Sequence, residues 1–195
     1  MSGGAVVAVL AGGRSRRMGT AKATVRLGGR PLVDWPLAAA ARAGLEAVVV
    51  AKPGSELPAL AVPVWREPPA PSHPLAGLVC ALERAGGRPV VAAACDMPFV
   101  SPELLARLAA IEAPAAAARV GGRLEPFPGR YSGAALGVLR AALAREAPVR
   151  EALASLAPAE LGEDELLAFG DPFVMVAGVN TPSELAAAEA IVRQA

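Results

Sequence analysis

The chain has 195 residues, with 19 basic and 18 acidic side chains and a formal net charge of +1, so its overall charge favours neither nucleic acid nor an anionic membrane as a partner. Glycine, proline or a charged residue interrupts every apolar run before the roughly 18 residues that a membrane-spanning helix requires. The first residues lack the basic start and apolar core of a signal peptide, and the two cysteines lack CxxC spacing, so we expect a soluble cytoplasmic protein.

Short runs with strand character alternate along the chain with alanine-rich helical stretches. The expected strands are residues 5–11, 47–51, 62–65, 89–95 and 173–176. The expected helices are residues 32–43, 75–84, 102–111 and 134–145, followed by a C-terminal helix that ends near residue 192. Near-continuous apolar strands between helices are typical of a mostly parallel sheet that is buried on both faces. We therefore expect residues 1–195 to form a single α/β domain.

Capping residues mark where two of these helices begin. Ser101 precedes a proline, which is favourable at the first helical position, and Thr181 is followed three residues later by Glu184, the pattern of a capping box. Pro36 conflicts with the interior of the helix at 32–43 because it has no N–H to donate. One interpretation places the true start of that helix at Pro36.

Glycine and proline residues predict two irregular segments in the second half of the chain. Gly121 and Gly122 predict a tight turn between two strand-like pieces. Residues 125–131 contain two prolines and a glycine, which predicts a loop rather than a strand. No repeat of fixed period is visible, which favours one domain.

A glycine-rich basic loop, LAGGRSRRMGTAK, follows the first expected strand at residues 10–22. Its glycines allow positive φ angles and expose backbone N–H groups, while its arginines and Lys22 add positive charge, a combination that suits a polyphosphate. The spacing matches neither GxGxxG nor GxxxxGK[ST], the two common nucleotide loops. The alternative is a surface turn with solvated arginines.

Asp96 follows the apolar run 90–95, at the end of another expected strand. In a parallel sheet this position shares an edge with the glycine-rich loop, where open α/β folds bind ligands. One carboxylate together with phosphate oxygens and water commonly holds Mg²⁺. The alternative is an aspartate that merely opens the turn before Pro98.

Four stretches occur in order along most of the chain, from residue 6 to about residue 188: LAGGRSRRMGTAK, HPLAGLVCAL, ACDMPFVSPELL and GVNTPSEL. Together they resemble the molybdenum cofactor guanylyltransferases of the MobA family. The resemblance implies a three-layer α/β/α, Rossmann-like nucleotidyltransferase fold and transfer of GMP from GTP to molybdopterin, with release of pyrophosphate. It also implies Mg²⁺, with Mn²⁺ as a substitute, and it leaves molybdoenzyme apoproteins or their chaperones as candidate protein partners.

The resemblance further implies roles for individual residues. The expected nucleotide-binding residues are Leu10, Ala11, Gly12, Gly13, Lys22, Glu67, Pro74, Leu75, Ala76, Gly77 and Asp96. The expected catalytic residues are Arg17, Lys22 and Asp96, and the expected metal ligands are Asp96 and Asn180. Residues 74–77 resemble a loop that closes over the base and ribose, and residues 125–127 a segment near the pterin, with Arg150 available to an anionic substrate.

The chain departs from the family pattern at several positions. Ala21 replaces an acidic residue, His73 replaces a glycine, Gly178 replaces an asparagine, and Lys52 stands near the position of an asparagine that is common after the second strand. Alternatives therefore remain: a nucleotidyltransferase that uses CTP or another phosphorylated acceptor, or a nucleotide-binding or cofactor-carrier module without activity. The two glycines after Ala11 favour guanine, because related cytidylyltransferases tend to carry a bulkier residue there.

Overall fold

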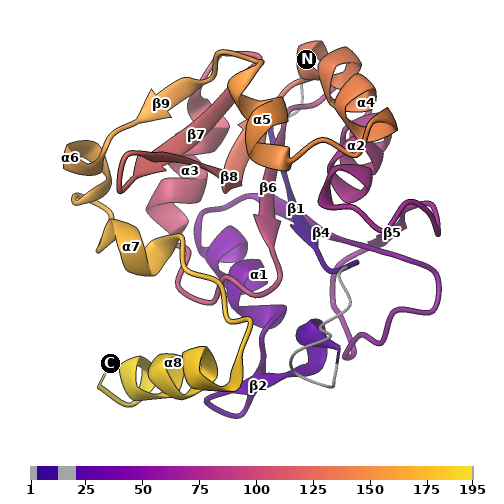
Figure 1. Ribbon diagram of the computed structural model, residues 1–195. Helices are drawn as coiled ribbons and strands as arrows, with labels where there is room; N and C mark the ends of the chain where they lie inside the picture. The colour runs from indigo at the N-terminus through magenta and orange to yellow at the C-terminus, as the bar shows by residue number, and fades with distance from the viewer. Residues whose placement is uncertain (1–3, 13–20, 195) are drawn as a thin grey trace.

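The computed structural model describes residues 4–12 and 21–194 (Figure 1). Its main sheet has seven strands in the order β5-β4-β1-β6-β8-β7-β9. Strand β8 runs antiparallel to both of its neighbours, and the other pairs of neighbouring strands are parallel, which confirms the mostly parallel sheet. The strands of the main sheet are β1 (Val6–Leu10), β4 (Glu46–Ala51), β5 (Val64–Arg66), β6 (Val90–Ala94), β7 (Ala115–Val120), β8 (Arg123–Tyr131) and β9 (Ala159–Leu161).

Helices cover both faces of this sheet, as expected for three layers (Figure 1). Helices α1 and α3 pack on one face, and α2, α4 and α5 pack on the other. None of the helices in the described part of the chain has both the length and the apolar character needed to span a bilayer. The helices are α1 (Asp34–Arg42), α2 (Pro74–Arg84), α3 (Pro102–Ala110), α4 (Leu136–Ala144), α5 (Val149–Ala154), α6 (Glu163–Leu166), α7 (Pro172–Met175) and α8 (Pro182–Gln194), with short 3₁₀ turns η1 (Lys22–Thr24) and η2 (Gly133–Ala135).

Strand β1 explains why the apolar runs are nearly continuous. Val7 and Val9 belong to the core under α1 and α3, whereas Val6 and Ala8 belong to the core under α2 and α4. Successive side chains of a strand point to opposite faces, so a strand that is covered on both faces needs apolar residues at every position.

The helix starts follow the predicted caps. The Ser101 hydroxyl accepts a hydrogen bond from the Leu104 N–H at 3.1 Å. In the capping box of α8, the Glu184 N–H donates to the Thr181 hydroxyl at 3.2 Å, and the Thr181 N–H donates to the Glu184 carboxylate at 2.9 Å. Helix α1 begins at Asp34, so Pro36 lies in the first turn, where its missing N–H leaves no hydrogen bond unmade.

A small apolar cluster joins the last helix to the beginning of the chain. Helix α8 packs on the two-stranded sheet of β2 (Arg26–Leu27) and β3 (Arg30–Pro31), and the two segments lie side by side in Figure 1. The Gly28 N–H also donates to the Glu189 carboxylate at 2.9 Å. This packing holds the segment that precedes α8 close to the segment that follows the glycine-rich loop.

Two predictions of secondary structure were wrong. Residues 173–176, expected as a strand, lie in and just after α7, because the Asp171 carboxylate caps that helix by accepting from the N–H groups of Phe173 and Val174. Residues 125–131, expected as a loop, form most of β8 between β6 and β7. The pairing of β7 with β8 shifts in register between Ala117 and Ala118, so the two prolines fall where no ladder hydrogen bond is needed.

Candidate active site

Four residues follow four neighbouring parallel strands at the same edge of the sheet. Gly12 lies just beyond β1, Lys52 follows β4, Glu67 follows β5 and Asp96 lies just beyond β6. The carboxyl edge of an open parallel sheet is where such folds bind ligands, because the loops there can diverge and leave a crevice.

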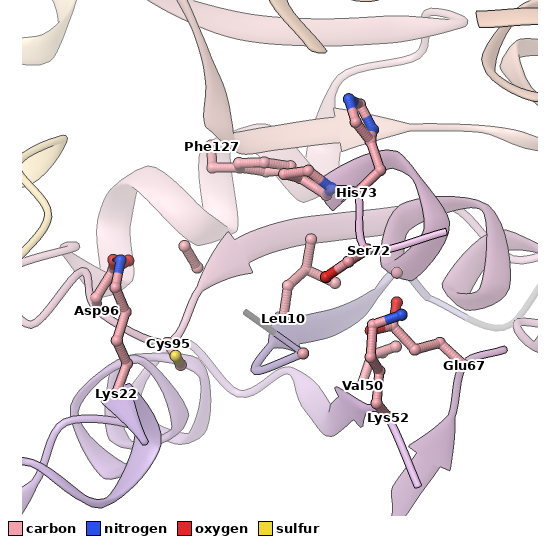
Figure 2. A pocket seen from close by; sticks show the side chains of 14 residues that line it. Leu10, Lys22, Val50, Lys52, Glu67, Ser72, His73, Cys95, Asp96 and Phe127 are labelled. Carbon is pink, nitrogen blue, oxygen red and sulfur yellow. The ribbon is translucent and has the colours of Figure 1, made fainter. Parts of the chain in front are cut away.

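A cavity of about 250 Å³ opens at this edge (Figure 2). Lys22 and Asp96 lie at one end of it, Lys52 and Glu67 lie at the other, and Leu10 is on the floor between them. The lining residues are Leu10, Gly12, Lys22, Val50, Lys52, Glu67, Ser72, His73, Pro74, Gly77, Ala94, Cys95, Asp96 and Phe127. The cavity therefore has charged side chains at both ends and the apolar side chain of Leu10 between them.

At the first end, the Lys22 ammonium joins two oxygen atoms from distant parts of the chain. Its Nζ lies 2.6 Å from Asp96 Oδ2 and also donates to Asn180 Oδ1. The Val179 N–H donates to the Asp96 carbonyl at 2.8 Å, which holds the segment before α8 against the end of β6. The structure thus brings together Lys22, Asp96 and Asn180, the three residues that the sequence analysis expects near the phosphates and the metal.

At the second end, the Glu67 carboxylate is buried between two glycines. A Cβ atom at Gly12 would overlap with Glu67 Oε1, and a Cβ atom at Gly77 would lie 3.0 Å from Oε2. Gly12 has no positive φ, so that part of the expectation was wrong; the close approach of the Glu67 carboxylate is what requires a glycine here. Burial raises the pKa of the Glu67 carboxyl, and the nearby Lys52 ammonium opposes that rise.

The wall between the two ends is formed by the start of α2. Residues 74–77, expected as a closing loop, are the first turn of this helix. His73 is its N-cap, and its Nδ1 accepts a hydrogen bond from the Leu75 N–H at 3.2 Å. The single histidine of the sequence therefore has a structural partner in the helix that lines the cavity.

Cys95 also lines the cavity, but its thiol is buried beside Asp96. Burial raises its pKa to about 12, so the group stays a neutral thiol near neutral pH. It packs with the core under α1 and α3 and does not have the chemistry of a nucleophile.

A second cavity, of about 320 Å³, meets the first at Asp96. The two share Ala94, Asp96 and Phe127 in their linings. Arg150, which also lines the second cavity, donates from Nη2 to both carboxylate oxygens of Glu125, at 3.0 and 3.1 Å, and from Nε to the Leu124 carbonyl at 2.6 Å. This arrangement can hold two ligands whose reacting ends meet beside one carboxylate.

Some of the residues expected to bind nucleotide line the first cavity, and others do not. Of the expected residues, Ala11, Leu75 and Ala76 are buried in the fold and do not line the first cavity. Gly13 and Arg17 lie outside the described residues, so their expected roles stay predictions. Lys52 lines the cavity without a role predicted from the sequence. The signal that could have indicated it is its position directly after β4, equivalent to that of Glu67 after β5.

Asp96 and Asn180 have the donor chemistry of a divalent-cation site. Their oxygens converge on one positively charged atom, Lys22 Nζ, so the geometry already gathers oxygen ligands around a cation. No group of three or more His, Cys, Asp and Glu side chains with metal-binding spacing occurs among residues 4–12 and 21–194. Mg²⁺ commonly takes only one or two carboxylates and fills its shell with water and substrate phosphates, so this donor set fits it.

Two cavities that meet at a strand-end carboxylate, at the carboxyl edge of an open α/β sheet, suit a transferase that brings two substrates together. The family model for the MobA-like NTP transferase domain matches residues 7–160. The chain belongs to this family.

Relatives and solved structures agree with this membership. A molybdenum cofactor guanylyltransferase from Cereibacter sphaeroides is 38% identical over 95% of this chain and 96% of its own length. The crystal structure of molybdopterin-guanine dinucleotide biosynthesis protein A from Archaeoglobus fulgidus superposes with a TM-score of 0.83 at 27% identity, over 97% of this chain and all of that one. The 2-C-methyl-D-erythritol 4-phosphate cytidylyltransferase from Thermus thermophilus has a TM-score of 0.70 at 24% identity over 97% of this chain and 98% of that one, which shows a shared fold.

Proposed function

We propose that this protein is a molybdenum cofactor guanylyltransferase, which transfers GMP from GTP to molybdopterin and releases pyrophosphate. The observation that carries the proposal is the meeting of two cavities at Asp96. A transfer reaction needs the donor and the acceptor to present their reacting atoms at one point. The full-length relative from Cereibacter sphaeroides, named for this activity, supports the choice of substrates.

We assign the first cavity to GTP, with its phosphates beside Lys22 and Asp96. The base then lies at the opposite end, beside Glu67 and above the apolar side chains of Leu10 and Val50. Guanine presents two adjacent donors, N1–H and the 2-amino group, which match an ionised carboxylate as acceptor. Cytosine presents an acceptor, N3, beside its amino group, so an ionised Glu67 favours guanine over cytosine.

We assign a divalent cation, Mg²⁺ or Mn²⁺, to Asp96 and Asn180 together with the phosphates of GTP. When bound, it would neutralise charge that develops on the phosphates during transfer. Lys22, once freed from the two oxygens, would then be available to the same phosphates. Its ammonium would then stabilise the departing pyrophosphate.

We assign the second cavity to the acceptor, with its terminal phosphate beside Asp96. An oxygen of that phosphate attacks the α-phosphorus of GTP, and the bond from the α-phosphorus to the bridging oxygen of pyrophosphate breaks. The attacking phosphate is already anionic near neutral pH, so the chain need not supply a general base. The residues instead bind and align the two substrates.

The setting of this reaction follows from the same assignment. We place it in the cytoplasm, where buried thiols such as Cys80 and Cys95 remain reduced. Molybdoenzyme apoproteins or their chaperones would receive the product.

A pyrophosphate-release assay tests the function. We expect release with GTP, Mg²⁺ and molybdopterin together, and little with CTP or with a sugar phosphate as acceptor. Release with CTP instead of GTP would overturn the guanine assignment, and release with a sugar phosphate but not with molybdopterin would overturn the acceptor. Binding of GTP without turnover under any of these conditions would favour a carrier module.

A further inference from the structure

Lys52 makes an unusual set of contacts at the base end of the first cavity. Its Nζ donates to the backbone carbonyls of Pro68, Pro69 and Pro71, at 3.2, 2.8 and 3.0 Å. A lysine ammonium carries three protons, so these three carbonyls account for all of them. The ammonium therefore holds the loop that follows Glu67 in place through hydrogen bonds.

Within the part of the chain that the structure describes, residues 68–72 make no hydrogen bond other than those from Lys52. Residues 68–70 are exposed and so lack the packing that fixes a buried segment. Prolines have no N–H, so the loop cannot build a ladder of its own backbone hydrogen bonds. A charged donor that reaches three carbonyls replaces such a ladder, and charge-assisted hydrogen bonds are the stronger kind.

Lys52 is itself firmly placed at the sheet edge. Its backbone carbonyl accepts a hydrogen bond from Arg66 Nη1 at 3.0 Å, and the Glu67 N–H donates to the Ala51 carbonyl at 3.1 Å. Lys52 and its hydrogen bonds thus connect the ends of β4 and β5 to the loop that follows Glu67. The same loop leads directly into His73 and the first turn of α2.

Both walls of the base end depend on this loop. Glu67 precedes it and His73 follows it, and the carboxylate of Glu67 fits between Gly12 and Gly77 with almost no free space. A shift of the loop would move either the carboxylate or the helix start. The Lys52 ammonium also favours the ionised form of Glu67, against the effect of burial on its pKa.

We propose that Lys52 is a positioning residue for guanine nucleotide binding. Its hydrogen bonds hold residues 68–72, the proline loop, so that Glu67 and the start of α2 stay in the positions that accept the base. The inference rests on the proposed function, because it takes the ligand to be GTP. Lys52 does not serve as a phosphate ligand here, since it lies at the opposite end of the cavity from Lys22 and Asp96 and its donors are engaged.

The test measures binding of two probes, GTP with Mg²⁺ and inorganic tripolyphosphate with Mg²⁺, by titration calorimetry. For Lys52→Met, which keeps the chain length but removes the donors, we expect the Kd for GTP to rise at least about tenfold. The Kd for tripolyphosphate should stay within about threefold of wild type, because the phosphate end is untouched. In turnover, KM for GTP should rise while kcat at saturation changes less than about threefold.

Two variants complete the design. Lys52→Arg retains several cationic donors and should restore GTP binding to within about threefold of wild type. Arg107→Met, which removes an exposed ion pair between two residues that do not line the cavity, Arg107 and Glu165, controls for the loss of a surface cation and should change neither Kd. If Lys52→Met does not fold, as judged by thermal unfolding, Lys52→Gln decides the matter by the same two titrations.

The outcomes separate this inference from the function on which it rests. Unchanged GTP affinity in Lys52→Met or Lys52→Gln would overturn the positioning role while leaving the guanylyltransferase intact. Equal loss of affinity for GTP and tripolyphosphate would also overturn it, since that pattern indicates general damage. A wild-type protein that binds no GTP would overturn the proposed function and this inference with it.

Discussion

The Lys22 ammonium lies 2.6 Å from the Asp96 carboxylate and also donates to the side-chain oxygen of Asn180. These residues come from the 3₁₀ turn η1, the end of β6 and the segment before α8, so only the folded chain brings them together. A single cationic atom thus occupies the point between two oxygens that we assign to a divalent cation. This relationship implies that Lys22 and the metal compete for the same oxygens until GTP offers its phosphates to Lys22.

Replacing Lys22 with methionine should therefore have two opposite effects. We expect turnover to fall at least about tenfold, roughly 1.4 kcal/mol of transition-state stabilisation, because the departing pyrophosphate loses a cation. We expect Mn²⁺ to bind the nucleotide-free variant more tightly than wild type, because the competing ammonium is gone. Steady-state kinetics and Mn²⁺ titration followed by electron paramagnetic resonance would measure both. Arg88→Met, which removes an exposed pair with Glu46, is the control, and unaltered kinetics in Lys22→Met would refute its phosphate role.

Asp96→Asn tests the carboxylate at which the two cavities meet. The amide keeps the shape of the side chain but removes its negative charge, so metal binding in the GTP complex should weaken. We expect turnover to fall by about 100-fold, equivalent to roughly 2.7 kcal/mol, while the unfolding midpoint stays within about 4 °C of wild type. Pyrophosphate release and thermal unfolding provide the two measurements. A folded variant with near-normal turnover would remove Asp96 from the metal site.

Gly12→Ala tests the close approach of the Glu67 carboxylate to the first loop. The added methyl group would overlap with Glu67 Oε1, so the carboxylate must move and GTP binding should weaken at least about tenfold. Gly137→Ala is the matched control, because Gly137 lies in α4 with open space around its Cβ position. There, alanine should raise the free energy of unfolding by about 0.5–1 kcal/mol and leave GTP binding unchanged. Equal GTP affinity in both variants would contradict the assignment.

The stability of the α8 capping box should depend on pH. Hydrogen bonds to the Glu184 carboxylate, above all from the Asn180 N–H at 2.6 Å, lower its pKa below the ordinary value of 4.5. Because the folded pKa is the lower one, the stabilisation is present above that ordinary value and is lost as the pH falls through the folded pKa. Urea unfolding at about pH 7 and about pH 3 should show wild type more stable than Glu184→Gln at the higher pH, with a smaller difference in acid. A difference independent of pH would mean that the charge of Glu184 is not involved.

Local patterns in the sequence were sufficient for much of the fold. The strands that became β1, β4 and β6 are buried on both faces and therefore read as unbroken apolar runs. The caps at Ser101 and Thr181 are recognisable because each side chain bonds to the backbone within its own first turn. The place of Asp96 in the site could be predicted for a similar reason. It lies just beyond the end of a strand, and recognising such a position requires no knowledge of distant residues.

Long-range contacts decided what these patterns could not. Residues 125–131 became part of β8 because residues 129–131 pair with both β6 and β7 and Glu125 pairs with β7, while the two prolines fall in the irregular stretch between these pairs. Residues 173–176 have strand-like composition, yet the Asp171 cap and the packing of Met175 on the core favour a helix.

The sequence by itself determined the alternation of strands and helices, the helix caps and the presence of polar residues at the strand ends, because each depends on neighbours within a few positions. The tertiary structure alone decided which of those residues meet. Lys22 reaches Asp96 and Asn180, Glu67 fits between Gly12 and Gly77, and Lys52 holds the proline loop, because parallel strands from distant parts of the chain end at one edge. Such meetings depend on the order of strands in the sheet, which no local pattern encodes.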